Sequence, residues 1–280
     1  MNIVKSTHKY EDWLRRRTPV LEPDLRLKHG FMKKSVFMFL RATFYRWAQV
    51  WPEVCSEFTK APRVLAVGDL HIENFGTWRD SEGRLIWGIN DFDEACEVPY
   101  TNDLVRLAVS AALAIEEKHL GISKKEACEA ILDGYLEGLK SGGQPYVLEE
   151  ENDWLRRIAL GELRDPVHFW KKMDSLPPVK GSLPVTAVEA LEHLLPEKNL
   201  SCTIVRRVAG LGSLGHQRLV ALATWRGGRI AREAKALVPS ACYWAAGSDS
   251  ATEVMYQAIV SRAARCPDPF LHLRGKWIIR

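Results

Sequence analysis

Two short apolar runs in the first third of the chain each end in a cluster of polar and acidic residues. The runs at 64–67 and 85–89 have the length and composition of buried strands. The sequence GDLHIEN (68–74) follows the first run, and NDFD (90–93) follows the second. Acidic side chains beside apolar strands are costly unless a cation or hydrogen bonds satisfy them. The pattern therefore predicts a functional site at the ends of these two strands.

Longer stretches with apolar residues at helical spacing lie on both sides of these runs. Residues 35–50 predict one helix with an aromatic face, which ends at Pro52. The stretches 103–119 and 124–140 predict two more amphipathic helices, the second preceded by a capping box. Residues 1–30 are polar and basic, and we expect them to form a surface arm. Shorter helices are predicted at 149–163, 186–195 and 251–264.

The pattern changes after residue 165. Residues 174–184 contain three Pro residues and one Gly and predict a linker. Beyond it, alternating apolar positions replace the helical spacing, and a hairpin turn is expected at 225–228. Strands are predicted at 202–208, 217–224, 229–237 and 276–279. The sequence thus predicts an α+β protein of two lobes, with a helical lobe at 1–165, a linker and short helix at 166–195, and a β-rich lobe at 196–280.

The composition of the 280 residues is that of an ordinary globular protein, with 46% hydrophobic and 26% charged residues. The net charge of +4 is small and spread along the chain, so no nucleic-acid partner is expected. The six Cys residues form no CxxC pair, which argues against a disulfide framework or a zinc site and favours a reducing cytoplasm. No apolar run has the length of a membrane span or a signal core, so no membrane partner is expected.

A second motif, GLGSLG (210–215), lies in the β-rich half. Dinucleotide-binding folds place such a motif between a strand and a helix, whereas here it lies between two predicted strands. A glycine-rich hairpin between strands covers the nucleotide phosphates in protein kinases. That arrangement requires a Lys on the next strand and a Glu on the following helix, and Lys235 and Glu253 occupy these places. The predicted nucleotide-binding residues are Gly210, Gly212, Ser213, Gly215, Lys235 and Glu253.

The two acidic clusters fit the same arrangement. Kinases carry a catalytic Asp followed five residues later by an Asn, and Asp69 and Asn74 have this spacing. We predict that Asp69, with His71 beside it, is catalytic and orients the hydroxyl of the acceptor. The second cluster takes the place of the metal-binding segment. Asn74 and Asp91 are the predicted ligands of Mg²⁺, with Asp93 as an alternative or bridging ligand.

Each of these residues also has a purely structural explanation. Asp69 and Asn74 could bond backbone amides in a turn, and the glycines could form a flexible loop. His71 could be a hydrogen-bonding support of its loop. Lys235 could be a solvated strand residue, and Glu253 could lie on the surface of its helix.

The chain order differs from that of kinases, because the glycine loop follows the catalytic Asp. In this combination the sequence resembles the bacterial family DUF2252, which is placed in the protein-kinase-like superfamily. The loop at 68–74 is also similar to the HGDLHxxN loop of aminoglycoside and choline phosphotransferases, whose later Pro and Asp match Pro99 and Asp103. The segments that carry the resemblance are FLRATFYRW (39–47), GDLHIENFG (68–76), NDFDEA (90–95), NDLVRLAVS (102–110), VRRVAGLGSLG (205–215) and the strand at Ala234 and Lys235.

The resemblance implies a circularly permuted, two-lobed kinase-like fold, with ATP and Mg²⁺ as cofactors and a hydroxyl group of an unidentified small molecule as acceptor. Two departures are present: Val67 stands where the phosphotransferase loop has His, and Asp93 stands where kinases have Gly. A pseudokinase that binds nucleotide without transfer is therefore the alternative. A metallophosphoesterase, suggested by GDLH at 68–71, is a remote alternative, because that class also needs a DxH near its start, a GNH segment and a GHxH segment, and none of these is present.

Overall fold

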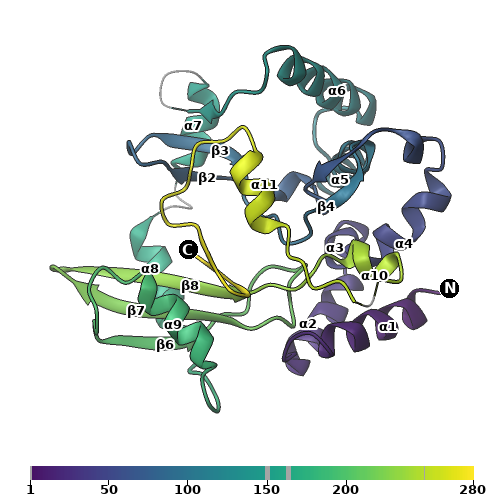
Figure 1. Cartoon of the computed structure of the whole chain (residues 1–280). Coiled ribbons are helices and arrows are strands. Elements are labelled where there is room, and N and C mark those ends of the chain that lie inside the picture. Colours follow the sequence, from purple (N-terminus) through teal and green to yellow (C-terminus); the bar gives the residue numbers. More distant parts are fainter. Residues whose placement is uncertain (1, 149–151, 162–164, 249) are drawn as a thin grey trace.

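The computed structural model describes residues 2–148, 152–161, 165–248 and 250–280, and it shows a mixed α+β protein (Figure 1). A five-stranded sheet forms one end of the molecule, and most helices gather at the other end with two smaller sheets. The α+β class is as predicted. Within the described residues, none of the helices combines the length and the apolar character needed to span a bilayer.

The first 30 residues are not a surface arm, and this prediction is wrong. They form two helices, α1 (Ile3–Arg15) and α2 (Glu22–Met32). Helix α1 buries Tyr10, Trp13 and Leu14, and Tyr10 stacks on Tyr45 at 4.4 Å between ring centroids. The many basic residues that suggested an arm occupy the exposed side of an amphipathic helix.

The helix predicted at 35–50 is divided into α3 (Val36–Ala42) and α4 (Phe44–Val54). The break lies at Thr43, whose backbone is not helical and whose hydroxyl donates to the carbonyl of Phe39 at 2.7 Å. Such local side-chain bonds compete with the helical ladder. Pro52 does not end the helix as predicted, since α4 continues to Val54.

Both apolar runs of the first third form strands, as predicted. Strand β1 (Arg63–Ala66) pairs antiparallel with β4 (Cys96–Pro99). Strand β3 (Leu85–Ile89) is the centre of a second sheet, between β2 (Phe75–Arg79) and β5 (Tyr146–Val147). The sequence pattern missed β2, because its burial does not alternate. Short 3₁₀ helices lie at η1 (Phe58–Lys60) and η2 (Ile72–Asn74).

Helices α5 (Thr101–Lys118) and α6 (Lys124–Lys140) lie close to their predicted positions, and the capping box of α6 joins Ser123 and Glu126. The helix predicted at 149–163 is shorter, at α7 (Asp153–Ala159), and both of its predicted ends fall on residues outside the described part. Two further helices, α8 (Pro166–Asp174) and α9 (Val185–His193), flank the linker; α8 was not predicted.

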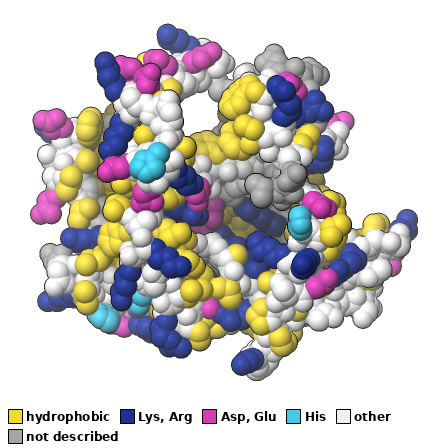
Figure 2. All heavy atoms as spheres, turned by 180° about the vertical axis from the view of Figure 1, so that it is seen from behind, with side chains coloured by type: hydrophobic (Ala, Val, Ile, Leu, Met, Phe, Trp, Pro, Cys, Tyr) yellow, Lys and Arg dark blue, Asp and Glu magenta, His cyan; other side chains and the backbone are white. Residues whose placement is uncertain are grey.

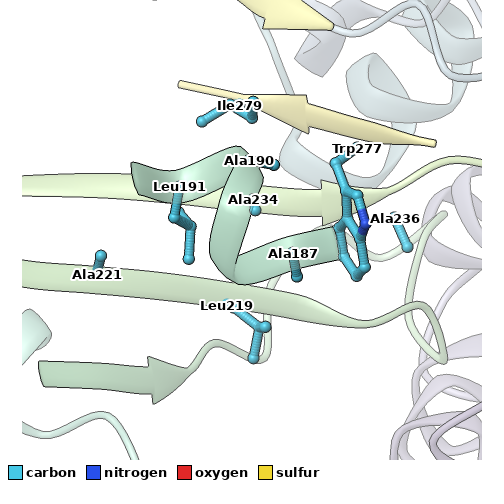
Figure 3. Packing of buried hydrophobic residues seen from close by; sticks show 9 residues of the cluster. All are labelled: Ala187, Ala190, Leu191, Leu219, Ala221, Ala234, Ala236, Trp277 and Ile279. Carbon is cyan, nitrogen blue, oxygen red and sulfur yellow. The ribbon is translucent and has the colours of Figure 1, made fainter. Parts of the chain in front are cut away.

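The five-stranded sheet is antiparallel, with the order β6-β7-β8-β10-β9. Its strands are β6 (Cys202–Arg206), β7 (Arg218–Trp225), β8 (Gly228–Ala236), β9 (His272–Arg274) and β10 (Trp277–Ile279). The hairpin turn at 225–228 is confirmed, and positive φ angles at Arg226 and Gly227 are typical of a tight turn between twisted strands. Helix α9 covers one face of this sheet, where Figure 3 shows a core of Ala187, Ala190, Leu191, Leu219, Ala221, Ala234, Ala236, Trp277 and Ile279.

After β8 the chain returns to the helical part of the molecule. Helix α10 (Ala241–Ala245) packs against α4, and Ala241 joins the core formed by Tyr10 and Trp13. Helix α11 (Tyr256–Arg262) packs Tyr256 against Phe92 in the second acidic strand end. The two halves of the sequence are therefore joined by shared cores as well as by the linker.

Candidate functional site

A polar cavity of about 210 Å³ lies where the glycine loop of the five-stranded sheet meets the loops after β1 and β3. It brings together segments that are far apart in the sequence. Eight of the eleven predicted site residues line it: Asp69, His71, Asn74, Asp91, Asp93, Gly210, Gly212 and Ser213.

Lys235 lies behind the acidic pair of this cavity rather than in its wall. The residue is only 5% exposed, and its Nζ is 3.3 Å from both carboxylate oxygens of Asp91 and also contacts Oδ2 of Asp93. Burial opposes ionisation of Asp91, but the charges of Lys235 and Arg280 and the hydrogen bonds with Asp93 together outweigh it and hold the pKa of Asp91 well below its usual value. Burial and the negative charge of Asp91 raise the pKa of Asp93. Lys235 thus binds the carboxyl groups of Asp91 and Asp93, whose pKa values are shifted in opposite directions.

Asp69 is held by a residue that the sequence interpretation missed, Arg106 of α5. Arg106 is completely buried, and its Nε donates to Oδ1 of Asp69 at 2.7 Å. It also donates to the carbonyl of Leu40 at 2.9 Å, and it lies over the rings of Phe44 and Trp47. An Arg on an otherwise apolar stretch, one turn after the start of a helix, was the available sequence signal. Because Arg106 binds Oδ1, the second oxygen of Asp69 is free to interact in the cavity.

Asn74 joins the two acidic loops through backbone groups. Its Nδ2 donates to the carbonyls of Asp69 at 3.2 Å and Asp91 at 2.9 Å, and its Oδ1 accepts from the backbone N–H of Asp91 at 2.9 Å. The side chain therefore has a structural role in addition to any role in ligand binding. Its oxygen retains one lone pair for a second partner.

Asp103 fixes the first loop from the start of α5. Its carboxylate accepts from the backbone N–H groups of Val67 at 2.7 Å and Gly68 at 3.0 Å. Gly68 has φ = +79°, and a Cβ there would lie 2.2 Å from the carbonyl oxygen of Glu94. Only Gly fits this turn, which places Asp69 at the cavity.

The glycine loop lies between β6 and β7, as predicted. Helix α2 holds it, because Lys28 Nζ donates to the carbonyl of Gly212 at 2.6 Å and Leu21 N–H donates to the carbonyl of Gly215 at 2.9 Å. A Cβ at Gly212 would lie 3.6 Å from Oδ2 of Asp69, so the loop approaches the predicted catalytic group closely. Burial lowers the pKa of Lys28 to about 8. The sequence interpretation missed Lys28, because it assigned α2 to a surface arm.

His71 is only 8% exposed, and its Nδ1 forms no hydrogen bond with any residue in the described ranges. Burial lowers the pKa of its imidazole, which favours the neutral form. Glu94, another residue that the interpretation missed, also lines the cavity. Burial raises the pKa of Glu94 to about 7, although its Oε2 accepts from the N–H of Ala241 at 2.7 Å.

The structure does not bring Glu253 to Lys235. Glu253 is exposed and lies outside a helix, because α11 begins at Tyr256 and not at Ala251 as predicted. The ion pairs that Lys235 forms with described residues are those with Asp91 and Asp93.

The family model described as "Uncharacterized protein conserved in bacteria (DUF2252)" matches residues 20–166, which is more than half of the chain. The chain belongs to the DUF2252 family. No curated protein and no solved structure matches it. The matched region of this DUF2252 protein includes both acidic loops and Arg106, and it ends before the glycine loop and Lys235.

The carboxylates of the DUF2252 chain fit a metal that arrives with phosphate groups better than a metal bound by protein alone. The described residues contain no group of three or more His, Cys, Asp or Glu that could hold an ion. Asp91 and Asp93 nevertheless present two carboxyl groups to one cavity, and Oδ1 of Asp93 is buried with no partner among the described residues. Mg²⁺ in nucleotide sites is typically bound by one or two carboxylates together with phosphate oxygens and water.

The surface of the DUF2252 protein carries cations in a recess. Viewed from behind, the molecule is hollowed between its sheet and its helical part, and Lys and Arg side chains are visible in the hollow (Figure 2). Basic residues inside a recess favour the approach of anionic ligands.

Proposed function

We propose that this protein is an ATP- and Mg²⁺-dependent phosphotransferase that acts on a hydroxyl group of a small molecule. In this proposal the chain has a two-lobed, kinase-like arrangement in circularly permuted order. The observation that supports it best is the meeting of the glycine loop and Lys235 with Asp69, Asp91 and Asp93. Lys235 and Asp91 are 144 residues apart in the sequence. Their pairing therefore comes from the tertiary fold and not from a local sequence pattern.

Each group has a distinct task in the proposed reaction. Backbone N–H groups of the glycine loop contact the phosphates, and Lys235 stabilises their charge from behind the acidic pair. Asn74, Asp91 and Asp93 would hold a Mg²⁺ ion that arrives with the nucleotide, and the ion would supply positive charge to the phosphates. Arg106 holds one oxygen of Asp69, so that Oδ2 can accept a hydrogen bond from the acceptor hydroxyl in a fixed direction.

The cavity is smaller than a nucleotide site needs to be. Its volume of about 210 Å³ is below the roughly 300–1,000 Å³ typical of ligand pockets. We therefore infer that the glycine loop moves away from Asp69 when nucleotide enters, which breaks the bond between Lys28 and Gly212. Lys28 then becomes available to the phosphates.

A second function, nucleotide binding without transfer, has one observation in its favour. Oδ1 of Asp69 is occupied by Arg106, and the amide of Asn74 bonds backbone groups, so a predicted catalytic side chain and a predicted metal ligand both have structural partners. A protein of this kind would bind ATP and leave it intact.

The experiment that tests nucleotide binding compares Lys235→Ala with Lys276→Ala, a change of an exposed Lys beside β10. We expect calorimetry to show ATP affinity at least about tenfold lower in Lys235→Ala, because the cation that offsets Asp91 and Asp93 is lost and these carboxylates then repel the phosphates. The Lys276→Ala variant should bind as the wild type does. Near-ultraviolet circular dichroism verifies that both variants are folded. Unchanged ATP affinity in folded Lys235→Ala would contradict the proposal.

A further inference from the structure

A second cavity, of about 740 Å³, lies between the β2-β3-β5 sheet and the segment around α11. Its walls are mainly aromatic and aliphatic, with Trp78 and Trp87 from the sheet and Trp154 from α7. This volume is within the range of roughly 300–1,000 Å³ that holds drug-sized ligands. Among the described residues that line it there is no Asp or Glu, whereas Arg262 and Arg265 both contribute.

Arg265 is the unusual group of this cavity. Its Nε and Nη1 are buried and form no hydrogen bond with any described residue. The guanidinium lies 4.2 Å from the centre of the Trp78 ring and 5.6 Å from that of Phe92. Burial lowers the pKa of Arg265, and nearby Tyr256 and Asp268 offset only part of this effect. A buried cation without an anionic partner is costly, and the two rings offset only part of that cost.

The partner that Arg265 lacks is an anion. The residues that line the cavity indicate which chemical groups a ligand with this anion must have. The rings of Trp78 and Phe92 lie against the guanidinium, and Arg265 is one of the residues that line the cavity, so a ligand in the cavity can approach it from there. A carboxylate would supply the charge-assisted hydrogen bond that Arg265 lacks in the described structure. The apolar walls require that the rest of the ligand be apolar.

We propose that this cavity binds a small amphiphilic carboxylate, with its apolar body against the tryptophan walls and its carboxylate on Arg265. The site is separate from the phosphotransferase site, because Asp69, Asp91 and Lys235 do not line it. The proposal therefore does not depend on the proposed function, and either one can fail without the other.

The test uses decanoate and 1-decanol, which share an apolar chain and differ in the charge of the head group. Binding is followed by calorimetry and by the fluorescence of the tryptophans that line the cavity. Wild type should bind decanoate at least about tenfold more tightly than decanol, since only decanoate pairs with Arg265. The Arg265→Gln variant should lose this preference and keep its affinity for decanol. The matched control is Arg262→Gln, which removes the exposed cation of the same cavity and should keep the preference.

Three outcomes would overturn the proposal: no binding of decanoate by wild type, equal binding of the two ligands, or a preference that survives Arg265→Gln. A stability measurement guards against misfolding of the variant. Arg265→Met replaces the unpaired cation by an apolar side chain of similar length, and its melting temperature should exceed that of wild type when no ligand is present. A lower melting temperature would show that the guanidinium supports the fold, and it would also overturn the assignment.

Discussion

The two cavities of this DUF2252 protein differ in whether their buried cations have acidic partners. In the smaller cavity Lys235 is paired with Asp91 and Asp93, and Arg106 is paired with Asp69. In the larger cavity Arg265 lies against two aromatic rings, and its Nε and Nη1 form no hydrogen bond with any described residue. Paired charges hold loops in a fixed geometry, whereas an unpaired buried charge leaves a site that a ligand can complete. Paired charges in a fixed geometry are typical of a catalytic site, whereas an unpaired buried charge is typical of a ligand-binding site.

The largest expected effect comes from the free oxygen of Asp69. Asp69→Asn keeps an oxygen that can accept from Arg106 but removes the charge that orients the acceptor. If Asp69 acts in transfer, phosphate release or transfer from ATP should fall by about 10²–10⁴-fold. ATP affinity, measured by calorimetry, should stay close to that of wild type. Wild-type turnover in the variant would refute the catalytic role, and folded wild-type protein that binds ATP without turnover would favour the binding-only function.

The next largest effect is a change in the free energy of unfolding when the paired Arg106 or the unpaired Arg265 is replaced. Arg106→Leu should lower the free energy of unfolding by about 3–5 kcal/mol, because it breaks a buried pair and leaves Asp69 without its cation. The opposite sign is expected for Arg265→Met. Urea denaturation measures both changes. Lys124→Ala is the control, since its ion pair with Glu116 is exposed to solvent and should contribute little to stability. A loss below about 1 kcal/mol in Arg106→Leu would contradict the comparison.

The smallest effect concerns pH and Glu94. Burial raises the pKa of Glu94 to about 7, above its usual value near 4.5. Between these two values the folded state binds a proton that the unfolded state has released. The contribution of Glu94 to stability is therefore present below pH 4.5 and is lost as the pH rises through 7.

The Glu94→Gln variant tests this sign, because Gln can still accept from the N–H of Ala241. At pH 8 it should be more stable than wild type by up to about 3 kcal/mol, and the difference should shrink toward pH 5. The pKa of Asp93 is also raised, so its contribution to stability is likewise lost as the pH rises. Asp93 is present in both wild type and Glu94→Gln. Urea titrations from pH 5 to pH 8 make the measurement, with the exposed Glu97→Gln as control. A difference that does not depend on pH would show that Glu94 is ionised throughout.

Much of the local structure followed from the sequence. The apolar runs that became β1 and β3, the strands β6 to β8 and the helices α5 and α6 lie close to their predicted positions. Their patterns are regular over several residues, and burial on one face enforces them. The pattern failed where a single residue decided the backbone, as at Thr43 between α3 and α4, and where a helix carried many charges, as in α1.

The candidate site was only half determined by sequence. Motif spacing identified the loops with Asp69 and Asp91, because each loop follows a strand that fixes its position. The partners of these residues come from distant segments: Arg106 binds Asp69, and Lys28 of α2 reaches Gly212, 184 residues later. Lys235 was expected to pair with Glu253 and instead pairs with Asp91 and Asp93.

The sequence by itself determined which short segments carry polar groups at strand ends and where the glycine hairpin lies. Only the tertiary structure decided which charges pair and that Arg265 has no acidic partner in the described part of the chain. The physical reason is that strand and helix patterns depend on neighbours a few residues apart. A buried charge is instead satisfied by whichever group the packing brings within about 3 Å, however far away it is in the chain.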